Sequence, residues 1–234
     1  MKPQALIFDV DGTLAETEEA HRRAFNEIFA EARVGAMWPD PDRGWVWDAA
    51  LYLRLLAVTG GKERMAHYLA AHLGLDPAPE RDRIAEIHRL KTRRFTELLG
   101  AGGLPLRDGI AETVAAARAR GVRLAVATTT SRPNVDAVCR SGFGAAAEAV
   151  FEVIAAGDDV AAKKPAPDVY HLALERLGLP AEACLAIEDS ANGLNAAQAA
   201  GLRCVVAPSR YTRSDPLGGA DRLVDQISPE AVGL

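Results

Sequence analysis

Two aspartates stand two residues apart, directly after a short apolar run near the start of the 234-residue chain. The run is Leu6-Ile7-Phe8, and Asp9 and Asp11 follow it in a segment that ends in Gly-Thr-Leu. A simple turn is the ordinary explanation of an Asp-Gly pair after a strand. However, Glu188 and Asp189 also follow an apolar run. Carboxylates at the same end of two parallel strands can meet, so we expect these groups to converge.

Convergence of these carboxylates has an electrostatic cost. Two carboxylates about 4 Å apart repel by about 4 kcal/mol at an effective dielectric constant of 20. A hard divalent cation with oxygen ligands, Mg²⁺, removes that conflict. The metal ligands that we predict are Asp9, the backbone carbonyl of Asp11 and Asp189, with Glu188 supporting them.

A lysine and a run of hydroxyls follow two further apolar runs. Lys164 precedes Pro165 and Pro167, which end a loop and start a helix, so the direction of the lysine is fixed. A solvated surface lysine is the alternative. Residues 128–131 are three threonines and a serine before a helix that starts with proline, which is a cradle for an oxyanion. The alternative is that one of these hydroxyls only caps the N-terminus of the following helix and the others have no role.

Together these groups predict phosphoryl transfer through an aspartyl-phosphate. We expect Asp9 to attack phosphorus, and Asp11 to protonate the leaving alcohol and then activate water. Lys164 neutralises the transferring group. The predicted catalytic residues are Asp9, Asp11, Lys164 and Thr128, and the predicted phosphate-binding residues of the same loops are Asp11, Thr128, Thr129, Thr130, Ser131, Asn134 and Lys164.

The elements that must position these groups alternate along the chain. Short apolar runs at 6–8, 124–127, 151–154, 185–187 and 204–206 lie between amphipathic stretches, which predicts a Rossmann-like α/β parallel sheet. From about residue 16 to residue 102 only helical patterns occur, near 47–57, 62–73 and 82–99 among others. The residues Gly100-Ala101-Gly102-Gly103 are interpreted as a flexible segment that leads the chain back to the sheet.

The chain is therefore expected to hold two domains. Residues 1–15 and 103–234 form the phosphotransfer core, and residues 16–102 form an inserted helical cap that leaves the sheet at the ligand-binding edge. We expect it to act as a lid there. Trp38, Trp45 and Trp47 are predicted to pack inside the cap.

Composition excludes several other classes of protein. The net charge of −5 gives no basic stripe for nucleic acid, and no apolar run approaches the ~20 residues of a membrane span. The three cysteines are scattered without a Cys-x-x-Cys pair, which disfavours disulfides and zinc. We expect a cytoplasmic monomer or weak homo-oligomer whose partner is a small molecule.

The ordered set of motifs resembles the haloacid dehalogenase superfamily over essentially the whole chain. The set is Asp-x-Asp-Gly-Thr after the first strand, Thr128 after the second, Lys164-Pro165 after the third and Glu188-Asp189 after the fourth. The second aspartate resembles the phosphatase and phosphomutase branches, because dehalogenases lack it. The helical insertion resembles the mobile cap of the superfamily.

Closer similarity is to the CbbY-type sugar-phosphate phosphatases. It lies in residues 14–19, 59–64, 87–91 and 128–134. This resemblance implies xylulose-1,5-bisphosphate, an inhibitory by-product of Rubisco, as the substrate. A ketose bisphosphate has a remote phosphate that needs cations. The cap residues expected to bind substrate are Glu18, Gly61, Lys62, Arg64, His88 and Arg89, although an ordinary solvated helix face is the alternative for each cation.

Two other functions are compatible with parts of this pattern. A phosphomutase similar to β-phosphoglucomutase uses the same two aspartates but returns the phosphoryl group to sugar. A signalling receiver domain is also an α/β fold with a phosphorylatable aspartate. It is shorter, has no cap, and accepts phosphate mainly at the end of its third strand, whereas here the motif ends the first.

Overall fold

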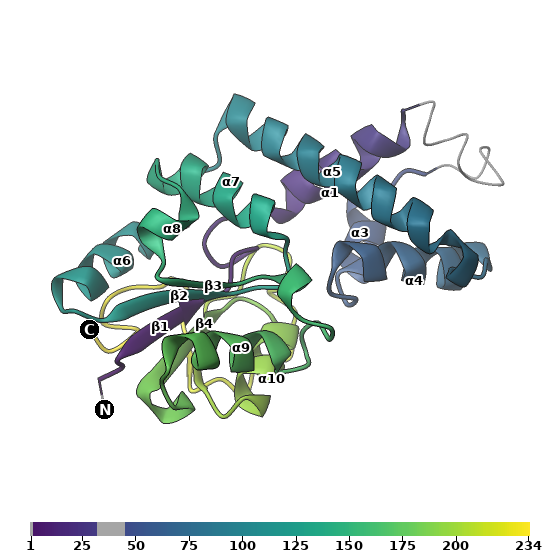
Figure 1. Ribbon diagram of the computed structural model, residues 1–234. Helices are drawn as coiled ribbons and strands as arrows, with labels where there is room; N and C mark the ends of the chain where they lie inside the picture. Colours follow the sequence, from purple (N-terminus) through teal and green to yellow (C-terminus); the bar gives the residue numbers. More distant parts are fainter. Residues whose placement is uncertain (1, 32–44) are drawn as a thin grey trace. The chain divides into compact units, whose positions relative to one another are not determined.

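The computed structural model describes residues 2–31 and 45–234. Contacts between residues divide the chain into two compact units, which are drawn in Figure 1. The first unit is formed by Met1–Thr17 and Gly103–Leu234, and we call it the sheet unit. The second is formed by Glu18–Gly102, and we call it the helical unit. Each is described here by itself.

The sheet unit is built on a six-stranded parallel sheet with the order β3-β2-β1-β4-β5-β6. Apart from the exposed β6, the strands are short and almost wholly buried, as expected of a parallel sheet covered on both faces. Their bounds are β1 Ala5–Phe8, β2 Arg123–Ala127, β3 Val153–Ala155, β4 Cys184–Glu188, β5 Arg203–Val206 and β6 Arg222–Leu223. The predicted α/β parallel sheet with a helical insertion after its first strand is confirmed.

The register between β1 and β4 brings the two acidic segments to one edge. Ile7 pairs with Ala186 and Phe8 pairs with Ile187. One step further, the backbone N–H of Asp9 donates to the carbonyl of Ile187 at 3.0 Å. The strand order reverses between these two strands, and such a switch point is where open α/β sheets bind ligands.

Helices cover both faces of the sheet (Figure 1). Ala5 and Ile7 of β1 pack against residues of α9 and α10 on one face of the sheet. Phe8 points to the other face, where its ring lies 5.9 Å from that of Phe151. This alternation is the two-residue period of a strand. The helices of the unit are α6 Ile110–Ala119, α7 Arg132–Phe143, α8 Ala147–Val150, α9 Asp168–Leu177 and α10 Ala191–Ala199, with 3₁₀ turns at Gly157–Asp159 and Ala181–Ala183.

Three details differ from the sequence-based expectation. The third strand begins at Val153, because its pairing with β2 begins there, opposite Ala125. The short exposed strand β6 was not predicted, since two residues carry no alternating pattern. The expected flexible return at Gly100–Gly103 is helical as far as Gly102, because α5 continues through it.

The helical unit has an aromatic core of its own. Phe25 and Phe29 of α1 contact Trp47, with centroid distances of 4.7 and 5.1 Å, and Trp45 contacts Tyr68 at 5.5 Å. The packing predicted for Trp45 and Trp47 is confirmed, and Trp38 lies outside the described residues. The helices are α1 Glu18–Phe29, α3 Ala49–Leu55, α4 Gly61–Leu73 and α5 Arg81–Gly102, with a 3₁₀ turn at Ala78–Glu80.

The three cysteines are buried free thiols. Burial raises the pKa of Cys139 to about 12, so this thiol stays protonated at neutral pH. Within residues 2–31 and 45–234, none of the helices combines the length and the apolar character that a bilayer crossing requires.

Gly109, which precedes α6, provides a test of the fold. Its φ of +80° disfavours any residue with a side chain, and a Cβ there would overlap the carbonyl oxygen of Ile227. We predict that Gly109→Ala lowers the free energy of unfolding by about 3 kcal/mol or more, from strain and overlap together. Urea denaturation monitored by circular dichroism measures the change.

Gly144→Ala is the matched control, because Gly144 has φ +69° but no described atom lies within 4 Å of its Cβ position. This variant carries the backbone strain alone, about 1 kcal/mol. Equal losses in the two variants would contradict the overlap at Gly109.

Candidate active site

Three carboxylates meet at the carboxyl edge of the sheet. Asp9, which follows β1, and Glu188 and Asp189, at the end of β4, each offer an oxygen, and these oxygens lie within 4.8 Å of one another. All three residues are buried, with 6%, 1% and 4% of their surface exposed. The convergence expected from the parallel strands is thus present in the structure.

Lys164 lies among these carboxylates. Its Nζ is 2.7 Å from Oδ1 of Asp9 and 2.6 Å from Oε1 of Glu188, and it also donates to the carbonyl of Ala127 at 2.8 Å. Only 4% of the residue is exposed, so it is not a solvated surface lysine. Three donor directions match the three hydrogens of an ammonium group, which holds Lys164 in one orientation.

Tyr170 completes the environment of Glu188. Its hydroxyl donates to Oε1 of Glu188 at 2.5 Å, and its ring lies 5.0 Å from Nζ of Lys164. Both donors therefore use the same carboxylate oxygen. The second oxygen, Oε2, is buried without a hydrogen-bond partner among the described residues. A buried oxygen in that condition is costly unless a ligand satisfies it.

The charges of this group are not balanced. Burial raises the pKa of Asp9 to about 7, and Glu188 adds to the rise, against the lowering effect of Lys164. Burial lowers the pKa of Lys164, but attraction to Asp9 and Glu188 outweighs it, so the net shift is upward and the lysine is charged. One ammonium faces three carboxylates, which favours a further cation.

Asp11 is placed beside this group by the turn after β1. Its Oδ1 accepts a hydrogen bond from the hydroxyl of Thr17 at 2.7 Å, and the residue is partly exposed. The group of three buried side-chain carboxylates does not include that of Asp11, whose predicted metal ligand is its backbone carbonyl. A partly exposed carboxylate remains able to exchange a proton with a bound molecule.

The hydroxyl loop at residues 128–131 leads into α7. The hydroxyl of Thr128 accepts from the backbone N–H of Thr130 at 3.3 Å, and the Thr130 hydroxyl accepts from Nδ2 of Asn134 at 2.9 Å. Ser131 takes the N-cap position, yet its side chain makes no capping hydrogen bond. Its buried Oγ and Oδ1 of Asn134 lack partners among the described residues. The unused hydroxyl of Ser131 can donate to an anion at this helix N-terminus, whereas Oδ1 of Asn134 can only accept a hydrogen bond. Thr129, next to them, is partly buried.

The helical unit contains a second cluster of polar side chains, several of them cationic. Arg64 is buried and donates to the hydroxyl of Tyr52 at 3.1 Å, and that hydroxyl donates to Glu18 at 2.7 Å. Nζ of Lys91 lies 2.6 Å from Nδ1 of His21, whose ring stacks on Phe95. Together with Lys62 and His88, these side chains form a cluster that we call the cationic group. Its members are Glu18, His21, Tyr52, Lys62, Arg64, His88 and Lys91.

Two predicted residues of the helical unit are placed differently from the expectation. Arg89 is exposed and pairs with Glu86 on the outer side of α5, so it is not brought to the cationic group. Gly61 was expected to let the backbone approach a ligand. The space that its Cβ would fill is instead occupied by the ring of His88, 2.6 Å from that position.

Four residues of these sites are absent from the predicted set. His21 and Lys91 are three residues from Glu18 and His88 on their helices, so helical spacing was the signal that could have placed them. Tyr170 was a polar group within the apolar stripe of its helix. Thr212, which contacts Asp189, lies in an irregular loop after β5 and carried no signal in the sequence.

The arrangement defines a class of protein, and the chain belongs to it. Residues 3–201 match the family described as haloacid dehalogenase-like hydrolase. The chain is therefore a member of the haloacid dehalogenase-like hydrolases. A fold alone does not fix the chemistry, but here the four strand-end motifs and the family agree.

Within that family the chain is similar to proteins named CbbY. It is 56% identical over 225 residues to Protein CbbY of Cereibacter sphaeroides, covering 96% of this chain and 93% of that protein. Protein CbbY of Rhodobacter capsulatus is 52% identical, with coverage of 99% and 96%. A crystal structure of a Rhodobacter sphaeroides CbbY variant in complex with xylulose-1,5-bisphosphate has a TM-score of 0.88 and 53% identity, with coverage of 99% and 100%.

More distant structures share the fold alone. A β-phosphoglucomutase from Clostridium difficile has a TM-score of 0.75 at 18% identity, and the match covers 97% of this chain and 92% of that one.

His88 makes the stability of the helical unit depend on pH. Burial lowers the pKa of His88 to about 3, and the charges of Lys91, Lys62, His21 and Arg64 lower it further. The unfolded chain binds a proton near pH 6.5 that the folded chain does not bind. Stability is therefore lost as the pH falls below about 6.5, by about 1 kcal/mol at pH 5.5.

We predict that the His88→Gln variant loses about 1 kcal/mol less of its free energy of unfolding between pH 7.5 and pH 5.5 than the wild type, because glutamine does not titrate. Urea unfolding of both proteins at pH 7.5 and pH 5.5 measures it, since other titrating groups are common to the two. An identical loss in the variant would contradict a neutral, desolvated His88.

Proposed function

We propose that the chain is a Mg²⁺-dependent phosphatase that hydrolyses a sugar bisphosphate through an aspartyl-phosphate on Asp9. The observation that carries this proposal is the placement of Asp9 at the end of β1, in contact with Lys164 and within a group of three buried carboxylates. A nucleophilic carboxylate, a fixed lysine and a site for a divalent cation are the parts that phosphoryl transfer requires.

The residues present fit a magnesium ion. Asp9, Glu188 and Asp189 are oxygen donors, which are the ligands that Mg²⁺ prefers, and Oε2 of Glu188 is a buried acceptor without a partner among the described residues. The pKa of Asp9 is raised mainly by burial and further by the charge of Glu188, so a bound cation would favour the charged form of this carboxylate. When bound, Mg²⁺ would offset the carboxylate charges and polarise a phosphate oxygen.

Asp9 is the proposed nucleophile. One of its carboxylate oxygens attacks phosphorus, an aspartyl O–P bond forms, and the bond from phosphorus to the sugar oxygen breaks. Lys164 contacts Oδ1 of Asp9 and is held at the same time by Glu188 and Ala127. Its charge therefore stays fixed while negative charge moves onto the sugar oxygen, and no reorganisation is needed during the step.

Asp11 is the proposed acid and base. In the first step it donates a proton to the departing sugar oxygen, and in the second it accepts a proton from the water that attacks the aspartyl-phosphate. Inorganic phosphate leaves and the Asp9 carboxylate is regenerated. Thr17 donates a hydrogen bond to Oδ1 of Asp11, which orients the carboxyl group.

The hydroxyl loop is the proposed cradle of the transferring phosphate. Ser131 contributes a hydroxyl without a partner among the described residues, and the N-terminus of α7 adds its dipole. Asn134 donates to the hydroxyl of Thr130, so we assign it to holding the loop in shape. Thr128 and Thr130 are bound to the loop itself, so we assign them to shaping the cradle.

We propose xylulose-1,5-bisphosphate as the substrate. The support is the similarity to the CbbY structure that holds this molecule, together with the cationic group of the helical unit. A bisphosphate has a second phosphate, and Lys62, Arg64 and Lys91 are the cations that we assign to it. Glu18 is assigned to a sugar hydroxyl.

Replacement of the nucleophile tests the mechanism. We predict that Asp9→Asn lowers phosphate release from xylulose-1,5-bisphosphate by at least about 10³-fold, since the amide cannot form the aspartyl-phosphate. The variant should keep its fold, because the amide has the same shape. Phosphate release and circular dichroism measure the two quantities.

Asp158→Asn, at an exposed position of the sheet unit, is the control and should leave phosphate release unchanged. Retained turnover in Asp9→Asn would exclude the proposed nucleophile. Turnover that requires a sugar-bisphosphate activator and gives a phosphorylated sugar as product would favour a phosphomutase instead.

Replacement of Arg64 tests the assignment of the second phosphate. We predict that Arg64→Ala raises KM for xylulose-1,5-bisphosphate by about 30-fold or more, because a buried charge pair is lost. KM for a pentulose monophosphate should change by less than about threefold, because that substrate lacks the second phosphate. Steady-state phosphate release with both substrates gives the comparison.

Arg83→Ala, which removes an exposed arginine paired with Glu80, is the control for loss of positive charge in the same unit. Equal rises in KM for the bisphosphate and the monophosphate would show that Arg64 does not bind the second phosphate.

A further inference from the structure

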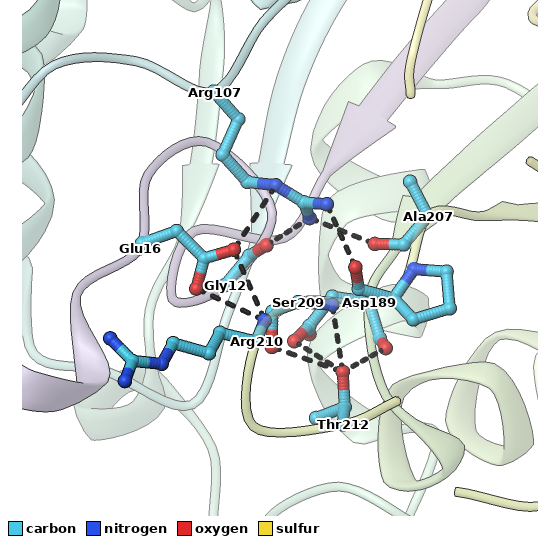
Figure 2. A network of polar contacts seen from close by, with 9 residues as sticks. Gly12, Glu16, Arg107, Asp189, Ala207, Ser209, Arg210 and Thr212 are labelled. Carbon is cyan, nitrogen blue, oxygen red and sulfur yellow. Dashed lines mark hydrogen bonds and ion pairs between the residues drawn. The ribbon is translucent and has the colours of Figure 1, made fainter. Parts of the chain in front are cut away.

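The carboxylate of Asp189 is held by a loop that follows β5. We call residues 207–212 the strap (Figure 2). The hydroxyl of Thr212 lies 2.6 Å from the carbonyl oxygen of Asp189 and 3.2 Å from its Oδ2. The same hydroxyl accepts the backbone N–H of Ser209 at 2.9 Å. The Oγ of Ser209 also lies 3.0 Å from this hydroxyl, and either oxygen can donate. Thr212 has a single proton, so its hydrogen bond to Asp189 is made chiefly to the nearer carbonyl oxygen and more weakly to Oδ2.

The space around Oδ2 of Asp189 is closed on its other side by Gly12. A Cβ at that position would overlap Oδ2 and would come within 3.1 Å of Cβ of Ser209. The glycine has φ +82°, a conformation that suits the turn after Asp11. Thr212, Ser209 and Gly12 together therefore leave the carboxylate little freedom to rotate.

Arg107 ties the strap to the turn after β1, as Figure 2 shows. Its guanidinium donates to the carbonyl oxygens of Gly12, of Ala207 at 2.8 Å and of Pro208 at 2.9 Å. The segments on either side of the carboxylate group are thus joined through one planar, always charged side chain. The position of Thr212 is fixed by this support.

Glu16 adds a second tether near the other end of the strap. Its carboxylate accepts the backbone N–H of Arg210 at 3.2 Å and lies 3.6 Å from Nε of Arg107. The strap is therefore held on both sides of Ser209, so Thr212 does not depend on one contact for its place.

We propose that Thr212 is a positioning residue that sets the affinity of the site for Mg²⁺ by fixing the orientation of Asp189. The inference rests on the proposed magnesium site and extends it beyond the carboxylates. A hydrogen bond to a metal-binding carboxylate fixes its orientation, and loss of such a partner typically weakens metal binding about 10- to 100-fold.

The experiment measures Mg²⁺ binding to the substrate-free protein by titration calorimetry and by the Mg²⁺-dependent rise in unfolding temperature. We expect Thr212→Val to weaken Mg²⁺ binding by about tenfold or more, because valine keeps the shape and removes the hydroxyl. Thr212→Ser should restore binding to within about threefold of the wild type, since it keeps the hydroxyl. In phosphatase assays the Mg²⁺ concentration for half-maximal rate should rise in Thr212→Val, with kcat at saturating Mg²⁺ changed much less.

Thr113→Val is the matched control. Thr113 is buried in the same unit, and its hydroxyl donates to the carbonyl of Gly109 at 2.7 Å, remote in the chain from the carboxylates. This variant loses a comparable hydrogen bond and should bind Mg²⁺ like the wild type. If Thr212→Val does not fold, Thr212→Ala is measured in its place, with the same expectation.

The possible outcomes separate this inference from the proposed function. Wild-type protein that does not bind Mg²⁺ would overturn the metal site of the proposed function. Wild-type binding with unchanged binding in Thr212→Val would overturn the role of Thr212 alone. Equal weakening in Thr212→Val and Thr113→Val, or no rescue by serine, would show a general effect on the fold and would also overturn it.

Discussion

The repulsion among three buried carboxylates is the constraint on which the rest of the site depends. Asp9, Glu188 and Asp189 are forced together because β1 and β4 are adjacent, parallel and in register at their carboxyl ends. Lys164 compensates part of this charge, and its ammonium is shared between two of the three. Burial, together with the charge of Glu188, raises the pKa of Asp9 despite the opposing effect of Lys164, and a divalent cation of suitable size would offset the remaining negative charge.

Around the carboxylates, some side-chain oxygens accept hydrogen bonds from the protein, and others have no hydrogen-bond partner among the described residues. Tyr170 and Lys164 both donate to one oxygen of Glu188, which leaves the other for a ligand. The same division recurs in the hydroxyl loop, where Thr128 and Thr130 bind within the loop and Ser131 does not. Satisfied donors give rigidity, and unsatisfied acceptors and donors mark where a ligand is needed.

The sequence predicted the features that follow from strand order and periodicity. Asp9 and Asp189 were expected to meet because parallel strands present their ends at one edge, and Lys164 was expected there because a strand precedes it. The direction of side chains on the helices was harder to predict. Arg89 and Lys91 lie two residues apart on α5, yet Arg89 is exposed and Lys91 is buried against His21.

Contacts made by irregular loops were outside the reach of sequence patterns. Thr212 is brought to Asp189 by a loop whose course depends on Arg107, a residue more than a hundred positions away. At Gly61 the sequence pattern correctly indicated that another group lies close to the backbone. It did not indicate that this group is the ring of His88. Long-range partners of this kind are set by tertiary packing, which no local spacing encodes.

The separate aromatic core of Glu18–Gly102 has an evolutionary consequence. Because Phe25, Trp47 and their neighbours stabilise that unit from within, residues on its surface can be replaced without loss of its core. Selection can therefore alter this insertion while the sheet unit, which holds the buried carboxylates, is inherited unchanged. An insertion with a self-sufficient interior lets one ancestral scaffold diversify into many enzymes.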